Sequence, residues 1–383
     1  MKIACFFATS GHSGVDRLAG HLVRGFAAAG HAVELVQIRR HGPYLHDLPA
    51  GVERVELDAA HVGTALLPLV RYLRRARPAV LLCDKYRVNR VALLARLLAR
   101  VDTRVVVRVG TTVSVDLASR ARRQRWFETL WMRLLYPRAD AVITPSQAAS
   151  LDVARVAGLP AAQVLTVPSP LIASDLLEKA SQPVDHPWLA TKDRPVILGA
   201  GELCARKDFA TLIRAFARVR PELPARLVIL GEGRQREELQ TLARDLGVAG
   251  DVSLPGFVRN PYAYMARADV FALTSRWEGF GNVLAEALAV GTPVVSTDCP
   301  SGPREILREG RYGTLVPVGD AARLAMALLH LLRDPPPRRH SLEAARPYEV
   351  SRAVAAYLAA CGIAERRVPE PFQKPSLAGP RSE

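Results

Sequence analysis

Short apolar segments typical of buried strands alternate with helix-forming segments through most of this chain of 383 residues. In the first half of the chain the strand-like segments are residues 3–8, 33–36, 80–84, 104–108 and 140–144. Regular alternation of strands and helices favours a parallel sheet that is doubly wound, with helices on both faces. A glycine-containing loop follows the first strand, at the edge of the sheet where such folds place their ligands.

A second alternation of the same kind follows an irregular stretch with several prolines. Its strand-like segments are residues 196–199, 226–230, 252–254, 268–273 and 291–296. We therefore predict an α/β protein with two Rossmann-like, doubly wound domains. The predicted parts are an N-terminal domain at 1–170, a linker at 171–193, a C-terminal domain at 194–345 and a disordered, proline-containing tail at 363–383.

The charge balance of the chain indicates anionic partners. Its 52 lysine and arginine residues exceed its 37 aspartate and glutamate residues, which gives a net charge of +15. Nucleotide phosphates, nucleic acid and anionic lipid surfaces all attract such a chain. No nucleic-acid-binding motif is recognisable, so nucleic acid is not an expected partner.

The spacing of the cysteines and the lengths of the apolar runs indicate the cellular compartment of the protein. The five cysteines are scattered and form no C-x-x-C pair, which is typical of reduced thiols in a cytosolic protein. The first residues lack the long apolar core of a signal peptide, and no run approaches the ~20 apolar residues of a transmembrane helix. We therefore expect a cytoplasmic protein.

Two glutamates eight positions apart mark the most informative stretch. Glu278 precedes a Gly-Phe-Gly turn, and Glu286 lies in a segment whose composition favours helix. A strand, a glycine turn and a helix in this order aim free backbone N–H groups at the crevice, which suits a pyrophosphate. Glu286 could then accept hydrogen bonds from two ribose hydroxyls. Alternatively, both glutamates are charges that the helix dipole favours near a helix start.

The Glu-Gly-Phe-Gly run that begins at Glu278, followed by Glu286, resembles the E-x7-E motif of retaining glycosyltransferases of family 4. The surroundings resemble that family too, with Leu-Gly-Glu-Gly at 230–233 and Gly-Thr-Pro-Val-Val at 291–295. The resemblance implies the GT-B fold, in which two Rossmann-like domains face each other across a cleft. It also implies that a C-terminal helix, at about residues 348–362, packs back on the N-terminal domain.

The resemblance further implies three catalytic residues. Glu278 would face the transferring sugar, and Lys207 would match the lysine of the family's Arg-x4-Lys donor-phosphate motif. Glu202 stands where that motif has its arginine, and Arg206 is a candidate substitute beside Lys207. Two adjacent cations before a helix can neutralise a diphosphate leaving group as the sugar bond breaks. Solvated surface cations are the alternative.

Other residues would bind the donor or line the acceptor side of the cleft. By the resemblance, the donor-binding residues are Gly14, Gly201, Val258, Phe280, Gly281, Asn282, Val283 and Glu286. The acceptor-side residues are Asp16, Arg17 and Thr111. Family members often carry a histidine near Thr111, and this chain has none there. No D-x-D motif occurs, so we expect neither a metal on the diphosphate nor a cofactor beyond the nucleotide sugar as co-substrate.

Residues 119–136 form the most basic and aromatic segment. On a helix, Phe127, Leu130, Trp131 and Leu134 would share one face, with arginines toward another. This pattern is typical of a helix that lies on an anionic membrane surface. The protein would then be peripheral on the inner face of the cytoplasmic membrane. A core helix with a solvated basic face is the alternative.

We interpret the chain as a metal-independent, retaining glycosyltransferase of the hexosyltransferase type. It would move a sugar from a nucleotide diphosphate sugar, with UDP favoured over GDP, to a glycan or lipid-linked saccharide. Cell-envelope processes such as lipopolysaccharide or exopolysaccharide synthesis would use this step. Two alternatives stay open: a non-catalytic protein that binds nucleotide sugars or polyanions, and a nucleotide-sugar epimerase on the same fold. The donor base, the sugar, the acceptor, the linkage and the oligomeric state are not encoded in any readable motif.

Overall fold

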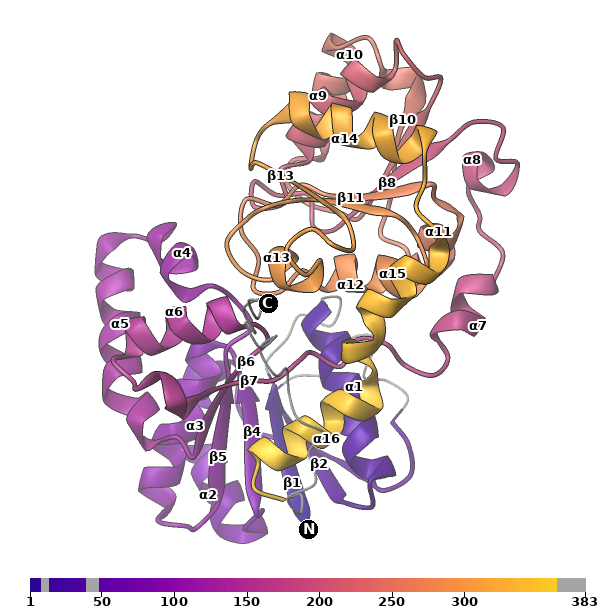
Figure 1. Ribbon diagram of the computed structural model, residues 1–383. Coiled ribbons are helices and arrows are strands. Elements are labelled where there is room, and N and C mark those ends of the chain that lie inside the picture. The colour runs from indigo at the N-terminus through magenta and orange to yellow at the C-terminus, as the bar shows by residue number, and fades with distance from the viewer. Residues whose placement is uncertain (8–13, 39–47, 364–383) are drawn as a thin grey trace, which may run out of the picture.

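The computed structural model describes residues 1–7, 14–38 and 48–363, which form two domains built on parallel sheets (Figure 1). The strand order of the N-terminal sheet is β3 (Val52–Glu56), β2 (Ala32–Gln37), β1 (Lys2–Phe7), β4 (Val80–Asp84), β5 (Arg104–Arg108), β6 (Ala141–Thr144) and β7 (Val164–Thr166). The strand order of the C-terminal sheet is β10 (Val252–Gly256), β9 (Arg226–Leu230), β8 (Val196–Ala200), β11 (Val270–Leu273), β12 (Val294–Thr297) and β13 (Thr314–Val316). The prediction of two doubly wound α/β domains is therefore confirmed.

Helices cover both faces of each sheet. The helices of the N-terminal domain are α1 (Gly14–Ala28), α2 (Leu66–Ala76), α3 (Tyr86–Ala99), α4 (Val113–Ala118), α5 (Arg122–Leu135), α6 (Gln147–Ala157) and α16 (Val350–Ala360). The helices after β7 and in the C-terminal domain are α7 (Leu176–Ser181), α8 (Pro187–Ala190), α9 (Phe209–Val219), α10 (Arg236–Asp245), α11 (Pro261–Arg267), α12 (Asn282–Ala289), α13 (Pro303–Ile306), α14 (Ala321–Arg333) and α15 (Arg338–Ala345).

Strand β1 shows why the apolar runs are nearly continuous. Ala4 and Phe6 pack with α2 and α3, whereas Ile3, Cys5 and Phe7 pack with α1 and α16 on the opposite face. All five side chains are fully buried. A parallel strand covered by helices on both faces must be apolar at every position, and so its sequence does not alternate between apolar and polar residues.

The strand order of each sheet reverses at one point. In the N-terminal sheet the reversal lies between β1 and β4, and in the C-terminal sheet between β8 and β11. Loops that leave two such neighbouring strands run to opposite sides, which opens a crevice at their carboxyl ends. In the C-terminal domain, the loop after β8 and the loop after β11 leave the sheet at this point.

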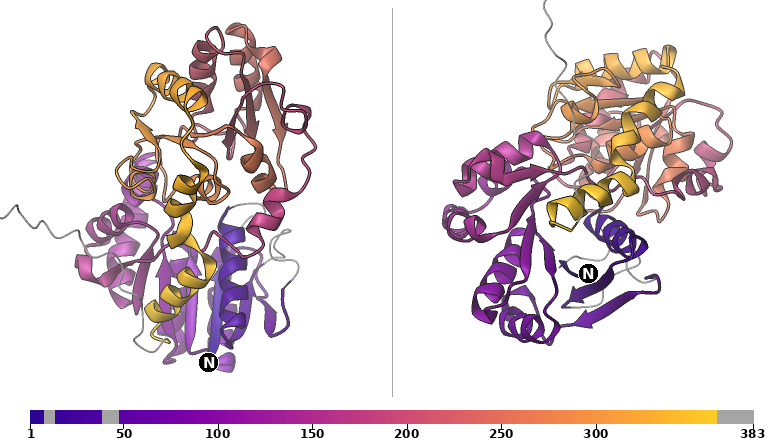
Figure 2. Two further views of the ribbon diagram at one scale, coloured as in Figure 1. Left: turned by 45° about the vertical axis from the view of Figure 1, so that its right-hand side comes forward. Right: turned by 60° about the horizontal axis from the view of Figure 1, so that its bottom comes forward.

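The chain crosses between the domains twice, and the two crossings are paired. The backbone N–H groups of Leu171 and Ile172 donate to the carbonyl oxygen of Tyr348, at 3.1 and 3.0 Å, and Val350 N–H donates to Ile172 at 2.9 Å. Helix α16 then lies alongside α1, as Figure 2 shows. Val354, Tyr357 and Leu358 of α16 are buried in the same core as α1.

The structure adds elements that the sequence pattern does not predict. Strand β3 forms the edge of the N-terminal sheet, and its VERVE sequence is mostly exposed. The segment predicted as a linker contains α7 and α8, whose apolar side chains pack into the core of the C-terminal domain.

The predicted tail, from residue 364 on, lies outside the described residues. Among the described helices, none combines the length and apolarity that spanning a bilayer requires.

Candidate active site

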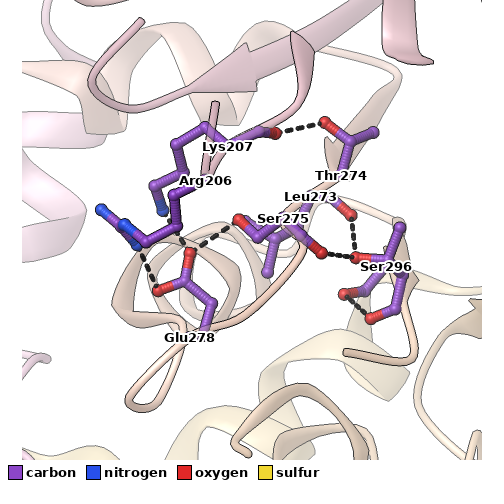
Figure 3. Close-up of polar contacts among 8 residues, drawn as sticks. Arg206, Lys207, Leu273, Thr274, Ser275, Glu278 and Ser296 are labelled. Carbon is purple, nitrogen blue, oxygen red and sulfur yellow. Dashed lines mark hydrogen bonds and ion pairs between the residues drawn. The ribbon is translucent and has the colours of Figure 1, made fainter. Parts of the chain in front are cut away.

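A buried carboxylate and two cations meet beyond the carboxyl ends of β8 and β11 (Figure 3). Lys207 Nζ lies 2.5 Å from Glu278 Oε1, and Arg206 Nη1 lies 3.0 Å from Glu278 Oε2. The Ser275 hydroxyl also donates to Glu278 Oε1, at 2.7 Å. The Glu278 and Lys207 side chains are less than a tenth exposed, whereas Arg206 is about one third exposed. The structure therefore brings together the three residues predicted as catalytic.

The order of strands explains this meeting. Lys207 follows β8 and Glu278 follows β11, and these two strands are hydrogen-bonded neighbours at the reversal point. Backbone contacts then fix one loop on the other. The Thr274 hydroxyl donates to the Lys207 carbonyl at 2.9 Å, and Arg276 N–H donates to the Arg206 carbonyl at 2.8 Å.

Glycine is required where the loops approach most closely. A Cβ atom at Gly201 would lie 2.9 Å from the Lys207 side chain, and the φ angle of Gly201 is +155°. A Cβ atom at Gly279 would lie 1.9 Å from the Gly110 carbonyl oxygen. Gly110 belongs to the N-terminal domain, and so the turn beside Glu278 touches the opposite domain directly.

The charges keep the Glu278 carboxylate ionised. Burial by itself would raise the pKa of Glu278, but Lys207 and Arg206, with the hydrogen bonds from Lys207 and Ser275, lower the pKa below its usual value. The two cations therefore compensate a buried negative charge.

The second glutamate of the motif is paired across the domains. Glu286 lies on α12 and is buried, and both of its carboxylate oxygens contact Arg17 Nη2, at 3.1 and 3.2 Å. Arg17 is on α1 of the N-terminal domain, and its Nη1 also donates to the Tyr262 hydroxyl at 3.3 Å. The guanidinium lies 5.8 Å from the centre of the Tyr262 ring.

Further polar contacts join the carboxyl edges of the two sheets. The Thr112 hydroxyl donates to the Glu278 carbonyl at 2.7 Å, and the hydroxyls of Ser146 and Ser301 are 2.6 Å apart. The Glu305 carboxylate accepts hydrogen bonds from the first two backbone N–H groups of α6, at 2.8 and 3.0 Å. The domains are thus in direct contact around the Glu278 turn.

The remaining predicted residues are distributed around this contact. Phe280 is nearly fully buried, and its ring packs edge-on against Tyr348 at 5.0 Å, so only its backbone can face a ligand. Gly281 has a φ angle of +96° and precedes α12, whose first residues are Asn282 and Val283. Gly14 begins α1, Asp16 is buried on that helix, Thr111 is in the loop that touches Gly279, and Val258 follows β10.

Sequence reasoning missed several of these contacts. Glu202 is exposed, and neither the motif around it nor the motif around Glu286 indicates that Arg17 pairs with Glu286. Ser275, Thr112 and Ser146 have no motif of their own, because their positions depend on how the loops and domains meet.

Among the described residues, no cluster of three or more histidine, cysteine, aspartate or glutamate side chains could hold a metal ion. The absence of a metal from the proposed reaction stays a prediction.

Two family models match the chain, one on each domain. Residues 13–170 match the model described as "Glycosyl transferase 4-like domain", and residues 194–334 match "Glycosyl transferases group 1". A curated relative from Campylobacter jejuni is 35% identical over 65% of this chain and 65% of its own length. Its name is N-acetylgalactosamine-N,N'-diacetylbacillosaminyl-diphospho-undecaprenol 4-alpha-N-acetylgalactosaminyltransferase.

A second curated relative is the lipopolysaccharide core biosynthesis glycosyltransferase LpsE of Rhizobium meliloti. It is 42% identical over 39% of this chain and 44% of its own length. The matches therefore span less than two thirds of the length of these relatives.

Solved structures show the same fold at low sequence identity. The Anabaena protein HepE in complex with UDP superposes with a TM-score of 0.75 and 19% identity, over 94% of this chain and all of the other. The lipopolysaccharide outer core galactosyltransferase WaaB gives a TM-score of 0.70 and 18% identity, over 94% of this chain and 99% of the other. With the GT-B fold and a glycosyltransferase model on each domain, the chain belongs to the GT-B superfamily of glycosyltransferases.

Proposed function

We propose that the chain is a retaining, metal-independent family 4 glycosyltransferase that moves a hexosyl group from a UDP-sugar to a lipid-linked saccharide in cell-envelope polysaccharide synthesis. The observation that carries the proposal is the cluster of Glu278, Lys207 and Arg206 at the crevice of the C-terminal domain. A transferase of this kind must stabilise a diphosphate leaving group and hold the sugar beside it. The cluster supplies cations for the first task and a carboxylate for the second.

The donor would rearrange this cluster. A diphosphate carries more negative charge than Glu278, so Lys207 and Arg206 would turn from the carboxylate to the phosphate oxygens. Glu278 would then be free to accept hydrogen bonds from the sugar hydroxyls. As the bond between the anomeric carbon and the phosphate oxygen breaks, the acceptor oxygen bonds to the same face of the sugar. Its proton passes to the departing phosphate, so no separate strong base is required.

Similar proteins support the choice of donor and acceptor. The name of the Campylobacter relative specifies a diphospho-undecaprenol acceptor and an alpha linkage, and HepE structures contain UDP and UDP-glucose. A relative from Mycolicibacterium smegmatis, in contrast, is named as GDP-mannose-dependent. UDP is therefore the first donor base to test, with GDP as the direct comparison.

The experiment measures nucleotide diphosphate release from a panel of UDP- and GDP-sugars, with and without a bacterial membrane lipid extract. Wild type is compared with Glu278→Ala and with Glu237→Ala, which removes an exposed glutamate of α10. We expect release that requires both the extract and Glu278, and that Glu237→Ala leaves unchanged. Donor binding without release under any condition would instead identify a binding protein. Sugar interconversion without an acceptor would identify an epimerase.

The surface of α5 supports the membrane part of the proposal. Met132 and Leu135 bury one side of this helix, whereas Trp126, Phe127 and Leu134 are 66%, 43% and 48% exposed. Exposed arginines flank these apolar side chains at 122, 123, 125 and 133. Large apolar side chains beside arginines suit the boundary of an anionic bilayer. We therefore propose that α5 binds anionic phospholipid and brings the protein to its lipid-linked acceptor.

Co-sedimentation with vesicles tests this part separately. We expect wild type to bind phosphatidylglycerol vesicles, to bind phosphatidylcholine vesicles much less, and to be released by salt. The double variant Trp126→Ser/Phe127→Ser should lose binding. The matched control Leu177→Ser/Met326→Ser removes two side chains that are 66% and 70% exposed elsewhere, and it should bind as wild type does. Equal binding by both double variants would refute the role of α5.

A further inference from the structure

Arg17, which was predicted to line the acceptor side, makes contacts that no motif of the sequence assigns. It extends from α1 of the N-terminal domain to Glu286 and Tyr262 of the C-terminal domain. Its side chain is only 16% exposed and that of Glu286 only 3%, so the ion pair is largely removed from water. The guanidinium therefore occupies the carboxylate that is the predicted partner of the donor ribose.

The ribose hydroxyls and the Arg17 guanidinium cannot both bind the two carboxylate oxygens of Glu286. Arg17 contacts both carboxylate oxygens, and two ribose hydroxyls would need those oxygens as acceptors. A bound nucleotide would therefore displace the guanidinium from Glu286. In a nucleoside diphosphate, the phosphates are attached to the same ribose, and so a new anion arrives beside the displaced cation.

We propose that Arg17 exchanges the Glu286 carboxylate for the donor diphosphate, and that it is a phosphate-binding residue supplied by the N-terminal domain. This inference rests on the proposed function and adds one residue to its donor site. A guanidinium can form two parallel hydrogen bonds with phosphate oxygens. Arg17 would thereby add a second arginine, beside Arg206, to a diphosphate site in which the exposed Glu202 replaces the family's arginine.

The exchange gives Arg17 opposite effects on two ligands. Uridine contains the ribose but no phosphate, so it has to break the Arg17–Glu286 pair and gains nothing from the released guanidinium. UDP breaks the same pair and then recovers a charge-assisted contact at the diphosphate. Removal of the guanidinium should consequently favour uridine and disfavour UDP.

NMR titrations of uridine and UDP into wild type and Arg17→Gln test this split. We expect Arg17→Gln to bind uridine more tightly than wild type and UDP more weakly, with the loss for UDP on the order of tenfold or more. Arg17→Lys, which keeps the charge without the planar fork, should recover part of the UDP affinity. Arg24→Gln is the matched control on the same helix and should resemble wild type.

The other outcomes are distinguishable. Equal losses for uridine and UDP would mean that Arg17 only supports the structure, and equal gains would mean that it only blocks Glu286; either result overturns the inference. Guanosine and GDP are titrated in parallel. If wild type binds neither UDP nor GDP, the proposed function fails. If wild type binds one diphosphate and Arg17→Gln binds it equally well, the inference about Arg17 alone fails.

Discussion

The Thr112 hydroxyl donates a hydrogen bond to the Glu278 carbonyl oxygen across the domain boundary, over 2.7 Å. Both residues are buried, so water does not compete for this bond. The side chain of Glu278 is held by Lys207 of its own domain, whereas its backbone is held by the opposite domain. The position of this carboxylate therefore depends on how the two domains are arranged.

Gly279→Ala should disrupt this arrangement. The added Cβ would lie 1.9 Å from the Gly110 carbonyl oxygen, and one of the two backbones would have to move. Displacement by about 1 Å can cost roughly 100-fold in rate, and we expect a fall in kcat/KM of that order. Gly250→Ala is the control, because a Cβ there meets no atom within 4 Å. Steady-state kinetics with equal losses in both variants would contradict this account.

Lys207→Ala should slow transfer more than it weakens donor binding. Negative charge on the leaving diphosphate is greatest in the transition state, where the ammonium contributes most. Losing one such contact commonly costs about 3 kcal/mol of barrier, or a fall in kcat of about 100-fold. Lys179→Ala, at a lysine that is 41% exposed, should change neither quantity. An unchanged kcat for Lys207→Ala would refute its role.

Arg108→Met should destabilise the N-terminal domain. The buried Arg108 guanidinium donates to Asp84 at 2.7 Å, to Tyr357 of α16 at 2.9 Å and to Ser169 at 3.2 Å. Without it, the Asp84 carboxylate is buried and unpaired, which typically costs about 3–5 kcal/mol. Urea unfolding should show this loss. The double variant Arg108→Met/Asp84→Asn removes the orphaned charge, and it should recover part of the stability.

Acid should remove the stability that the Glu278 ion pairs contribute. Because the pKa of Glu278 is lowered by folding, the unfolded chain takes up a proton at a higher pH than the folded chain does. The contribution is complete above the usual pKa of 4.5 and is lost as the pH falls through the lower folded value. Thermal unfolding of wild type and Glu278→Gln should thus differ most at neutral pH and converge below about pH 4.5. A constant difference would contradict this linkage.

The sequence predicts the main architecture because buried parallel strands are apolar at every position. Strand β3 was not predicted because it is an edge strand in which three of the five residues, Glu53, Arg54 and Glu56, are charged. Helix α15 was not predicted because it is only eight residues long and directly follows three prolines, although its residues favour helix. For β3, pairing with β2 rather than a local pattern decides the structure.

The candidate site is predictable where one loop carries its motif. Glu278 and Lys207 come together because they follow neighbouring strands, and the order of strands in such a sheet is regular. The Arg17–Glu286 pair joins residues 269 positions apart, and its formation depends on the approach of two domains. Hydrophobic periodicity contains no information about that approach. The contact of Glu305 with α6 was missed for the same reason.

The return of α16 to the first domain sets the order in which the domains can be completed during synthesis. The ribosome makes residues 1–170 first, but the core around α1 lacks Val354, Tyr357 and Leu358 until the end of the described chain has emerged. Strands β8 to β13 and their helices are complete before that point. The domain that is translated first is therefore the last to have its core completed, and the apolar surface that α16 covers is open to water in the interval.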